Sequence, residues 1–301
     1  MNPVLSDFVA HTATSLADAL ALLSEPPHPQ TGPWKPLAGG TDLMVQMGEG
    51  RLPAGRYVDL FSLPELRGIE MQETCIQIGA LTTYSDIRKH QELAREFPLL
   101  AEAARMTGAL AIQNRGTLGG NIANASPAAD TPPALLVYDA ELQLCSQRGI
   151  RTVPYSAFHV GYKRLALQPG ELISKILLPR CVKGTDGHPV HYYRKVGTRA
   201  AQAISKVCFA GFARKQGDTL SHVRIALGSV APTPVRCPLT ESFLASVPLS
   251  QLSLQTLQKA QATLAREISP IDDIRSTAAY RRKVAQNLLT QFIKTCQNPA
   301  P

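Results

Sequence analysis

Two short glycine-rich stretches stand out in this chain: Leu37-Ala-Gly-Gly-Thr-Asp-Leu43 and Thr117-Leu-Gly-Gly-Asn-Ile-Ala-Asn124. We call residues 37–43 the first glycine motif and residues 117–124 the second glycine motif. Glycine pairs let consecutive backbone N–H groups turn inward, and the missing Cβ lets a phosphate approach closely. Two such turns suit a ligand with two linked phosphates. Two ordinary turns are the alternative interpretation.

Side chains in both motifs add to the interpretation as a ligand site. Thr41 and Asn121 can donate hydrogen bonds beside the glycines. The short helix expected to begin at residue 41 and to end near Gly48 would point its positive end at the same place. The pattern therefore favours an anionic ligand held by both motifs.

Other nucleotide, hydrolase and metal signatures are missing from the sequence. It contains no GxGxxG, no Gly-Lys dipeptide for a P-loop, no GxSxG and no HExxH. Its six cysteines, at positions 75, 145, 181, 208, 237 and 296, include no CxxC pair. We therefore expect no zinc site, no redox dithiol and no iron–sulfur cluster in this chain.

Length and composition are those of a globular protein. At about 150 residues per domain, the 301 residues suggest two domains, and the chain is 44% hydrophobic and 18% charged. No apolar run is long enough to span a membrane. The first basic residue is Lys35, whereas a secretory signal needs a basic beginning. We therefore expect a cytoplasmic location.

The positive charge is concentrated in one segment. The chain has 31 Lys and Arg against 23 Asp and Glu, and residues 180–236 alone hold ten of the cations against two acids. Such a segment could serve nucleic acid, an anionic cofactor or an acidic protein partner, or it could be a solvated surface. No nucleic-acid-binding signature accompanies it, so we expect no nucleic acid.

Residue patterns predict alternating helices and strands, with strands most frequent in the middle of the chain. The predicted helices lie at 15 to about 25, 41–48, 83–90, 98–106, 130–138, 254–268 and 277–296. The predicted strands include 57–61, 70–79 and a hairpin that pairs 207–214 with 222–230. In the last helix, Tyr280, Val284, Leu288 and Phe292 recur every four residues, which is typical of core packing.

The two glycine motifs, with the second continuing to Ser126-Pro-Ala-Ala-Asp130, resemble the two FAD-binding signatures of one known family. This family is the flavoprotein (medium) subunit of the molybdenum hydroxylases, the xanthine dehydrogenase, carbon monoxide dehydrogenase and aldehyde oxidoreductase type. The resemblance covers essentially the whole chain in the right order. Its further segments are 161–162, 169–173, 194–199, 203–205, 224–236 and 273–282.

The resemblance implies an α+β fold. A two-lobed FAD-binding domain of the vanillyl-alcohol-oxidase type would span residues 1–178, with lobes at about 1–56 and 57–178. A small C-terminal domain of antiparallel sheet and helices would span residues 179–301.

The resemblance also implies a set of FAD-binding residues. The pyrophosphate and ribitol would be wrapped by Leu37, Ala38, Gly39, Gly40, Thr41, Asp42, Leu43, Thr117, Gly119, Gly120 and Asn121. Near the flavin would lie Asn124 and Asp130, with Ile173 on the adenine and Lys195 beside the isoalloxazine. Helix capping is an equal alternative for Asp42 and Asp130, and an exposed strand position is the alternative for Lys195. Neither motif contains His or Cys, so non-covalent FAD is expected.

The function implied is electron transfer. Electrons would pass from [2Fe–2S] clusters in a small partner subunit through this FAD to NAD, a quinone, a carrier protein or oxygen. Substrate would be oxidised at a molybdenum cofactor in a large partner subunit, in a heterotrimer or its dimer. This chain would hold no catalytic acid or base and no metal. Because no cysteine lies between Asn124 and Pro132, it would lack the [4Fe–4S] cluster of one branch. A freestanding FAD-dependent oxidoreductase or diaphorase, and an adaptor without flavin, are the alternatives.

Overall fold

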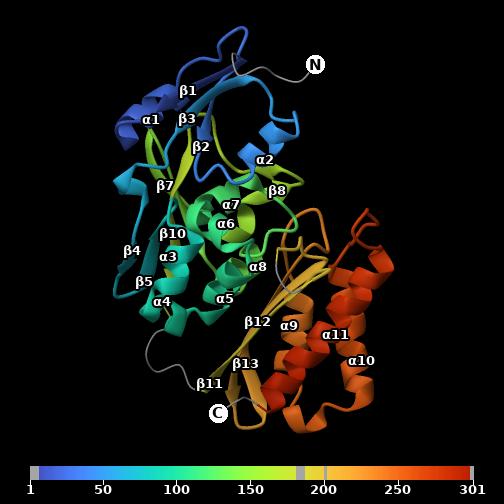
Figure 1. Cartoon of the computed structure of the whole chain (residues 1–301). Coiled ribbons are helices and arrows are strands. Elements are labelled where there is room, and N and C mark those ends of the chain that lie inside the picture. The colour runs from blue at the N-terminus through green and yellow to red at the C-terminus, as the bar shows by residue number, and fades with distance from the viewer. Residues whose placement is uncertain (1–6, 181–186, 200–201, 299–301) are drawn as a thin grey trace.

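The computed structural model describes residues 7–180, 187–199 and 202–298, and its three larger sheets follow one another along the molecule (Figure 1). The first lobe is a three-stranded parallel sheet in the order β1-β3-β2 with two helices. Its elements are β1 (Phe8–Thr12), α1 (Leu16–Leu23), β2 (Trp34–Leu37), α2 (Leu43–Gly48) and β3 (Gly55–Asp59). Helix α1 begins where predicted because the Ser15 hydroxyl accepts a hydrogen bond from the Asp18 backbone N–H at 3.1 Å.

The second lobe is a five-stranded antiparallel sheet in the order β4-β5-β10-β6-β7, with six helices inserted between β5 and β6. Its strands are β4 (Ile69–Met71), β5 (Cys75–Gly79), β6 (Glu141–Ser146), β7 (Gly149–Pro154) and β10 (Leu172–Pro179). Its helices are α3 (Tyr84–Lys89), α4 (Gln91–Glu96), α5 (Pro98–Met106), α6 (Leu110–Arg115), α7 (Leu118–Asn124) and α8 (Pro132–Val137). A small hairpin of β8 (His159–Gly161) and β9 (Arg164–Leu165) precedes β10, and 3-10 turns lie at Pro64–Leu66 and Tyr155–Ala157.

The C-terminal part is a four-stranded antiparallel sheet with helices on both faces. Its elements are β11 (His188–Val196), β12 (Val207–Gln216), β13 (Thr219–Gly228), β14 (Val235–Arg236), α9 (Pro238–Ala245), a 3-10 turn (Leu249–Gln251), α10 (Leu254–Glu267) and α11 (Ala278–Gln297). Helices α9 and α11 contact the sheet directly, α10 packs on them, and α5 and α8 of the second lobe contact the sheet as well. The core of the second lobe therefore continues into this sheet through Ala210, Phe212 and Ala226.

The predicted α+β class, with a terminal antiparallel sheet and helices, is confirmed. Three predicted details are wrong. Residues 70–79 form the hairpin β4–β5 rather than one strand, because a turn closed by the Gln72 N–H on the Cys75 carbonyl divides them. The second glycine motif is the start of helix α7, not a turn. In the last helix, Leu288 and Phe292 are buried as predicted, whereas Tyr280 is exposed.

The charge concentrated along residues 180–236 is partly neutralised in three dimensions. Four of its cations form ion pairs with carboxylates from outside that segment: Arg180–Glu96, Lys195–Asp130, Arg224–Asp139, and Arg236 with Asp139 and Glu241. Cys181 and Lys183 lie outside the described residues. Much of the charge therefore joins segments of this chain to one another. Within the described ranges, no helix is long and apolar enough to cross a membrane.

Candidate functional site

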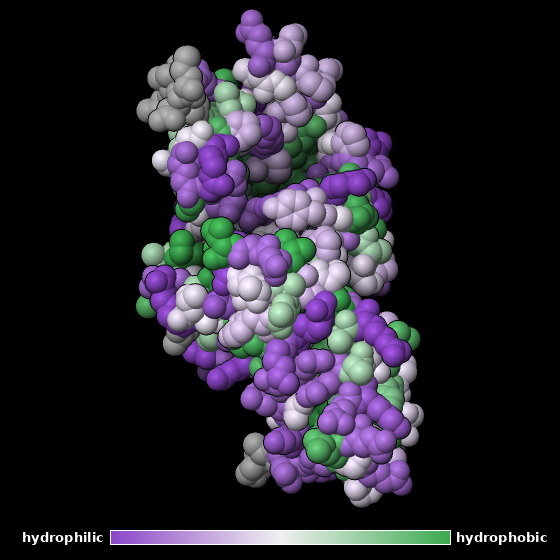
Figure 2. All heavy atoms as spheres, turned by 90° about the vertical axis from the view of Figure 1, so that its right-hand side faces the viewer, coloured by the Kyte–Doolittle hydropathy of each residue, from purple (hydrophilic) through white to green (hydrophobic). Residues whose placement is uncertain are grey.

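A cavity of about 430 Å³ lies where the first and second lobes meet, and both glycine motifs form part of its wall. Figure 2 views the molecule from the right-hand side of Figure 1 and shows a hollow in its upper half. Most of the residues predicted to bind FAD line this cavity: Ala38, Gly39, Gly40, Thr41, Asp42, Leu43, Thr117, Gly119, Gly120, Asn121, Asn124 and Ile173. Leu37, Asp130 and Lys195 are not among its lining residues.

The first glycine motif is a loop that joins the end of β2 to α2. Gly40 has a φ of +75°, a left-handed conformation that residues with a side chain rarely adopt. Among the described residues, none accepts a hydrogen bond from the backbone N–H groups of residues 39–43. Asp42 caps nothing: its carboxylate does not bond the α2 backbone and instead accepts a hydrogen bond from Gln46. The loop thus places five unused backbone donors in the cavity wall.

In the second glycine motif the backbone donors of residues 118–121 are already used. The N–H groups of Leu118 and Gly119 donate to the carbonyls of Thr82 and Ala80 at 3.0 and 2.8 Å. The next two donate to Thr117, Gly120 to its hydroxyl and Asn121 to its carbonyl. The prediction that both motifs present inward-turned N–H groups is therefore wrong for the second motif. The donors left there are side chains and the Thr117 N–H, for which no described residue is an acceptor.

Two asparagines can supply those side-chain contacts. The Asn121 Oδ1 atom accepts a hydrogen bond from the Thr131 hydroxyl at 2.6 Å, and the Asn124 Oδ1 atom accepts one from Lys163 at 3.0 Å. Because each amide oxygen has a partner, its orientation is fixed. Both amide N–H₂ groups are left to donate at the cavity.

The glycines of the two motifs also allow close contact between the lobes. A Cβ on Gly39 would lie 1.8 Å from the Arg115 carbonyl oxygen of the second lobe. Gly119 packs within the second lobe, where a Cβ would lie 2.6 Å from the Ala80 Cβ. A Cβ on Gly120 would lie 3.4 Å from the Ala38 Cβ. The two motifs thus lie side by side, although they are separated by more than 70 residues in the sequence.

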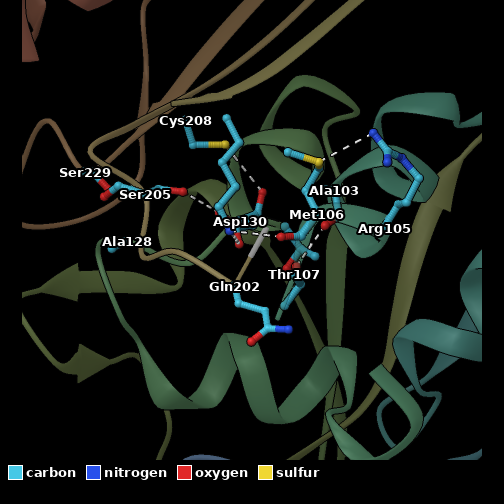
Figure 3. A network of polar contacts seen from close by, with 12 residues as sticks. Ala103, Arg105, Met106, Thr107, Ala128, Asp130, Gln202, Ser205, Cys208 and Ser229 are labelled. Atoms are coloured by element: carbon cyan, nitrogen blue, oxygen red, sulfur yellow. Dashed lines mark hydrogen bonds and ion pairs between the residues drawn. The ribbon is translucent and has the colours of Figure 1, made fainter. Parts of the chain in front are cut away.

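Asp130 and Lys195 form a buried ion pair with each other, with Nζ and Oδ2 2.6 Å apart and side chains 8% and 6% exposed. Lys195 also donates to the Met106 carbonyl, and the Ser205 hydroxyl donates to the other Asp130 oxygen. Figure 3 shows Asp130 at the centre of this network, with Ser205 and Cys208 on one side and Met106 on the other. The alternative of an exposed Lys195 is wrong. Burial raises the pKa of Asp130, and the ion pair with Lys195 opposes that rise.

The ion pair connects the C-terminal sheet to the cavity. The Tyr193 hydroxyl of β11 donates to the Asp130 carbonyl at 2.9 Å. Thr131, the residue after Asp130, donates its hydroxyl hydrogen to the amide oxygen of Asn121 in the cavity wall. No residue pattern predicted that Tyr193, Ser205 and Thr131 belong to this network, because nothing in the local sequence indicates that these groups meet.

The remaining walls are mostly apolar. They include Leu60, Leu66, Leu81, Leu167, Leu172 and the buried Tyr84. The lining residue Glu171 is paired with Arg151 at 2.7 Å, which lowers the pKa of Glu171. A mostly apolar pocket with a few placed polar groups is typical of a cofactor site. In the described part of the chain, no three His, Cys, Asp or Glu side chains are grouped to hold a metal ion.

Comparison with known proteins matches both parts of the chain to one group of families. Residues 6–181 match the family of the FAD binding domain in molybdopterin dehydrogenase, and residues 191–296 match the CO dehydrogenase flavoprotein C-terminal domain.

Curated relatives and solved structures agree with this match. The chain is 34% identical to the xanthine dehydrogenase FAD-binding subunit of Escherichia coli O157:H7, with 95% of each chain covered. It is 32% identical to the carbon monoxide dehydrogenase medium chain of Hydrogenophaga pseudoflava, with 97% of this chain and 96% of the relative covered. A chain of the reconstituted CO dehydrogenase from Oligotropha carboxidovorans superposes with a TM-score of 0.89 at 28% identity over the full length of both. The protein therefore belongs to the family of FAD-binding medium subunits of the molybdopterin dehydrogenases.

Proposed function

We propose that this chain binds FAD non-covalently in the cavity between its lobes and transfers electrons within a molybdenum-dependent dehydrogenase. The electrons would come from [2Fe–2S] clusters of a small partner subunit and leave to NAD, a quinone, a carrier protein or oxygen. The observation that carries the proposal is the meeting of both glycine motifs at one cavity, with five unused backbone donors in its wall.

The cavity residues fit FAD. The donors of residues 39–43, and the missing Cβ at Gly40, suit a diphosphate. The leucines of the wall suit a flat aromatic ring. No His or Cys lines the cavity among the described residues, so nothing there offers a covalent link to the flavin.

Most of the predicted binding residues have a proposed role. The first motif, Leu37 to Leu43, would hold the diphosphate, and the amides of Asn121 and Asn124 would donate to the ligand. Following the family resemblance, we place Ile173 on the adenine and the Asp130–Lys195 pair near the isoalloxazine ring. When bound, FAD accepts electrons singly and releases them in pairs. The chain itself would bind, orient and shield the flavin.

The partners follow from the relatives. The relatives from Hydrogenophaga pseudoflava and Sulfolobus acidocaldarius are named medium chains, and another relative is a subunit of a dehydrogenase complex. We propose a large subunit with the molybdenum cofactor and a small [2Fe–2S] subunit as partners, in a heterotrimer or its dimer.

Purification at native expression level tests the proposal. We expect two co-eluting chains, one larger and one smaller, with molybdenum and iron in the complex and one FAD per medium chain. The isolated chain should bind FAD, contain no iron and oxidise no aldehyde, purine or carbon monoxide. An isolated chain that reduces dyes with NADH at a rate typical of a diaphorase, and never co-elutes with partners, would favour a freestanding flavoenzyme. Failure to bind FAD would contradict the proposal.

A further inference from the structure

Tyr84 is a buried phenol at the wall of the cavity. Its side chain lines the cavity, and the residue is 3% exposed. No described residue shares a hydrogen bond with its hydroxyl. The Tyr84 hydroxyl is not among the fully buried unpaired side-chain atoms of the described residues, so it keeps accessible surface at the cavity that this residue lines. An unpaired hydroxyl at a ligand cavity therefore points to a partner on the ligand.

The position of Tyr84 is fixed by its backbone. It is the first residue of α3, which begins with a capping box formed by Thr83 and Asp86. Its N–H donates to the Gly116 carbonyl at 3.2 Å, directly before the second glycine motif. A Cβ on Gly116 would lie 2.9 Å from the Tyr84 ring, so the ring is packed against that glycine. The hydroxyl is thus held beside the motif on a rigid support.

The surroundings keep this hydroxyl protonated. Burial raises the pKa of Tyr84, and the negative charge of Asp130 raises it further. At neutral pH the group is therefore a hydrogen-bond donor as well as an acceptor. The N–H groups of residues 118–121 are used internally, so the Tyr84 hydroxyl adds a donor to the amides of Asn121 and Asn124 on this side of the cavity.

From this arrangement we infer that Tyr84 binds the flavin by donating its hydroxyl hydrogen to an acceptor atom of FAD. The inference rests on the proposed function, because it requires FAD in this cavity. The acceptor is either a ring carbonyl or nitrogen of the isoalloxazine or an oxygen of the diphosphate. Neither of the two glycine motifs includes Tyr84, so the inference adds a residue of α3 to the binding site.

Tyr84→Phe in the full chain tests the inference, because it removes one oxygen and keeps the ring. We expect FAD to bind about 3- to 10-fold more weakly, as for the loss of one hydrogen bond. Riboflavin, which lacks the diphosphate, locates the acceptor. Equal weakening of riboflavin and FAD, with a lower flavin midpoint potential, would place the acceptor on the ring. Weakening of FAD alone would place it on the diphosphate.

Tyr155→Phe is the matched control. Tyr155 is equally buried, and its hydroxyl is also unpaired among the described residues, but it does not line this cavity. We expect this variant to bind FAD as the wild type does. The inference is overturned if Tyr84→Phe, with an unchanged circular dichroism spectrum, keeps wild-type affinity and potential, or if Tyr155→Phe changes both to the same degree. If the wild type binds no flavin, the proposed function fails instead.

Discussion

In the first glycine motif the backbone N–H groups of residues 39–43 are unused, whereas the second motif is the start of a helix in which the N–H groups of residues 118–121 are bonded within the protein. The Gly-Gly pairs of the two motifs therefore have different structural roles. In the first motif, Gly40 permits a left-handed turn. In the second, Gly119 permits close packing on Ala80. Backbone changes in the first motif should affect binding most, and changes around the second should affect stability and side-chain orientation.

Gly39→Ala should have the largest effect, because Gly39 is the packing glycine within the first motif. Its new Cβ would lie 1.8 Å from a backbone oxygen, which cannot move as a flexible side chain could. We expect the free energy of unfolding to fall by about 3 kcal/mol, with loss of FAD. Urea denaturation measures the first and flavin absorbance the second. Wild-type stability in this variant would contradict the close contact of the motifs.

Lys195→Met should be almost as destabilising and should depend on pH. It leaves the Asp130 carboxylate buried without its cation, which costs about 3 kcal/mol, and it raises the pKa of Asp130 further above its unfolded value. An acid whose folded pKa is raised loses stability as the pH rises through that pKa. The loss in unfolding free energy should therefore be larger at pH 8 than at pH 5. A loss independent of pH would mean that packing, not charge, is what Lys195 supplies.

Gly40→Val tests the donor loop of the first motif. A Cβ there has room, since its nearest neighbour would be 3.7 Å away, so the strain comes from the positive φ, about 1–2 kcal/mol. We expect FAD affinity to fall at least about 100-fold as the loop relaxes and its donors turn away. Fluorescence titration measures this change. Gly48→Ala, at an open position in α2, is the control and should bind normally. Full flavin content in Gly40→Val would refute the loop as the diphosphate site.

Thr131→Val should have the smallest effect, confined to the second motif. It removes the hydroxyl that orients the Asn121 amide. We expect a 3- to 10-fold loss of FAD affinity and about 1 kcal/mol of stability, measured by titration and denaturation. Thr263→Val, whose hydroxyl bonds only within α10, is the control and should leave affinity unchanged. Equal losses in both variants would contradict a role of the Asn121 amide in FAD binding.

Local patterns predicted many of the helices and strands, and the family resemblance implied most of the residues that line the cavity. The capping box at Thr83, the turn at Gly217 and the two Gly-Gly pairs are each readable within a few residues. The Asp130–Lys195 pair joins residues that are 65 positions apart in the sequence. Tyr84 lines the cavity, but its capping box explains only why helix α3 begins there, not why Tyr84 reaches the cavity. Side-chain partners across such distances depend on packing, which residue spacing does not encode.

The order of strands in the second lobe has a consequence for synthesis on the ribosome. Strand β10 lies at the centre of the sheet and bonds to β5 on one side and β6 on the other, yet it is the last of the five strands in the chain. Until residue 179 has emerged, strand β5 of the β4–β5 hairpin and strand β6 of the β6–β7 hairpin both lack their partner strand β10. Unpaired strand edges invite association with other chains. The lobe therefore completes its sheet late in translation, and a ribosomal pause before β10 would prolong the interval in which the nascent chain is prone to aggregate.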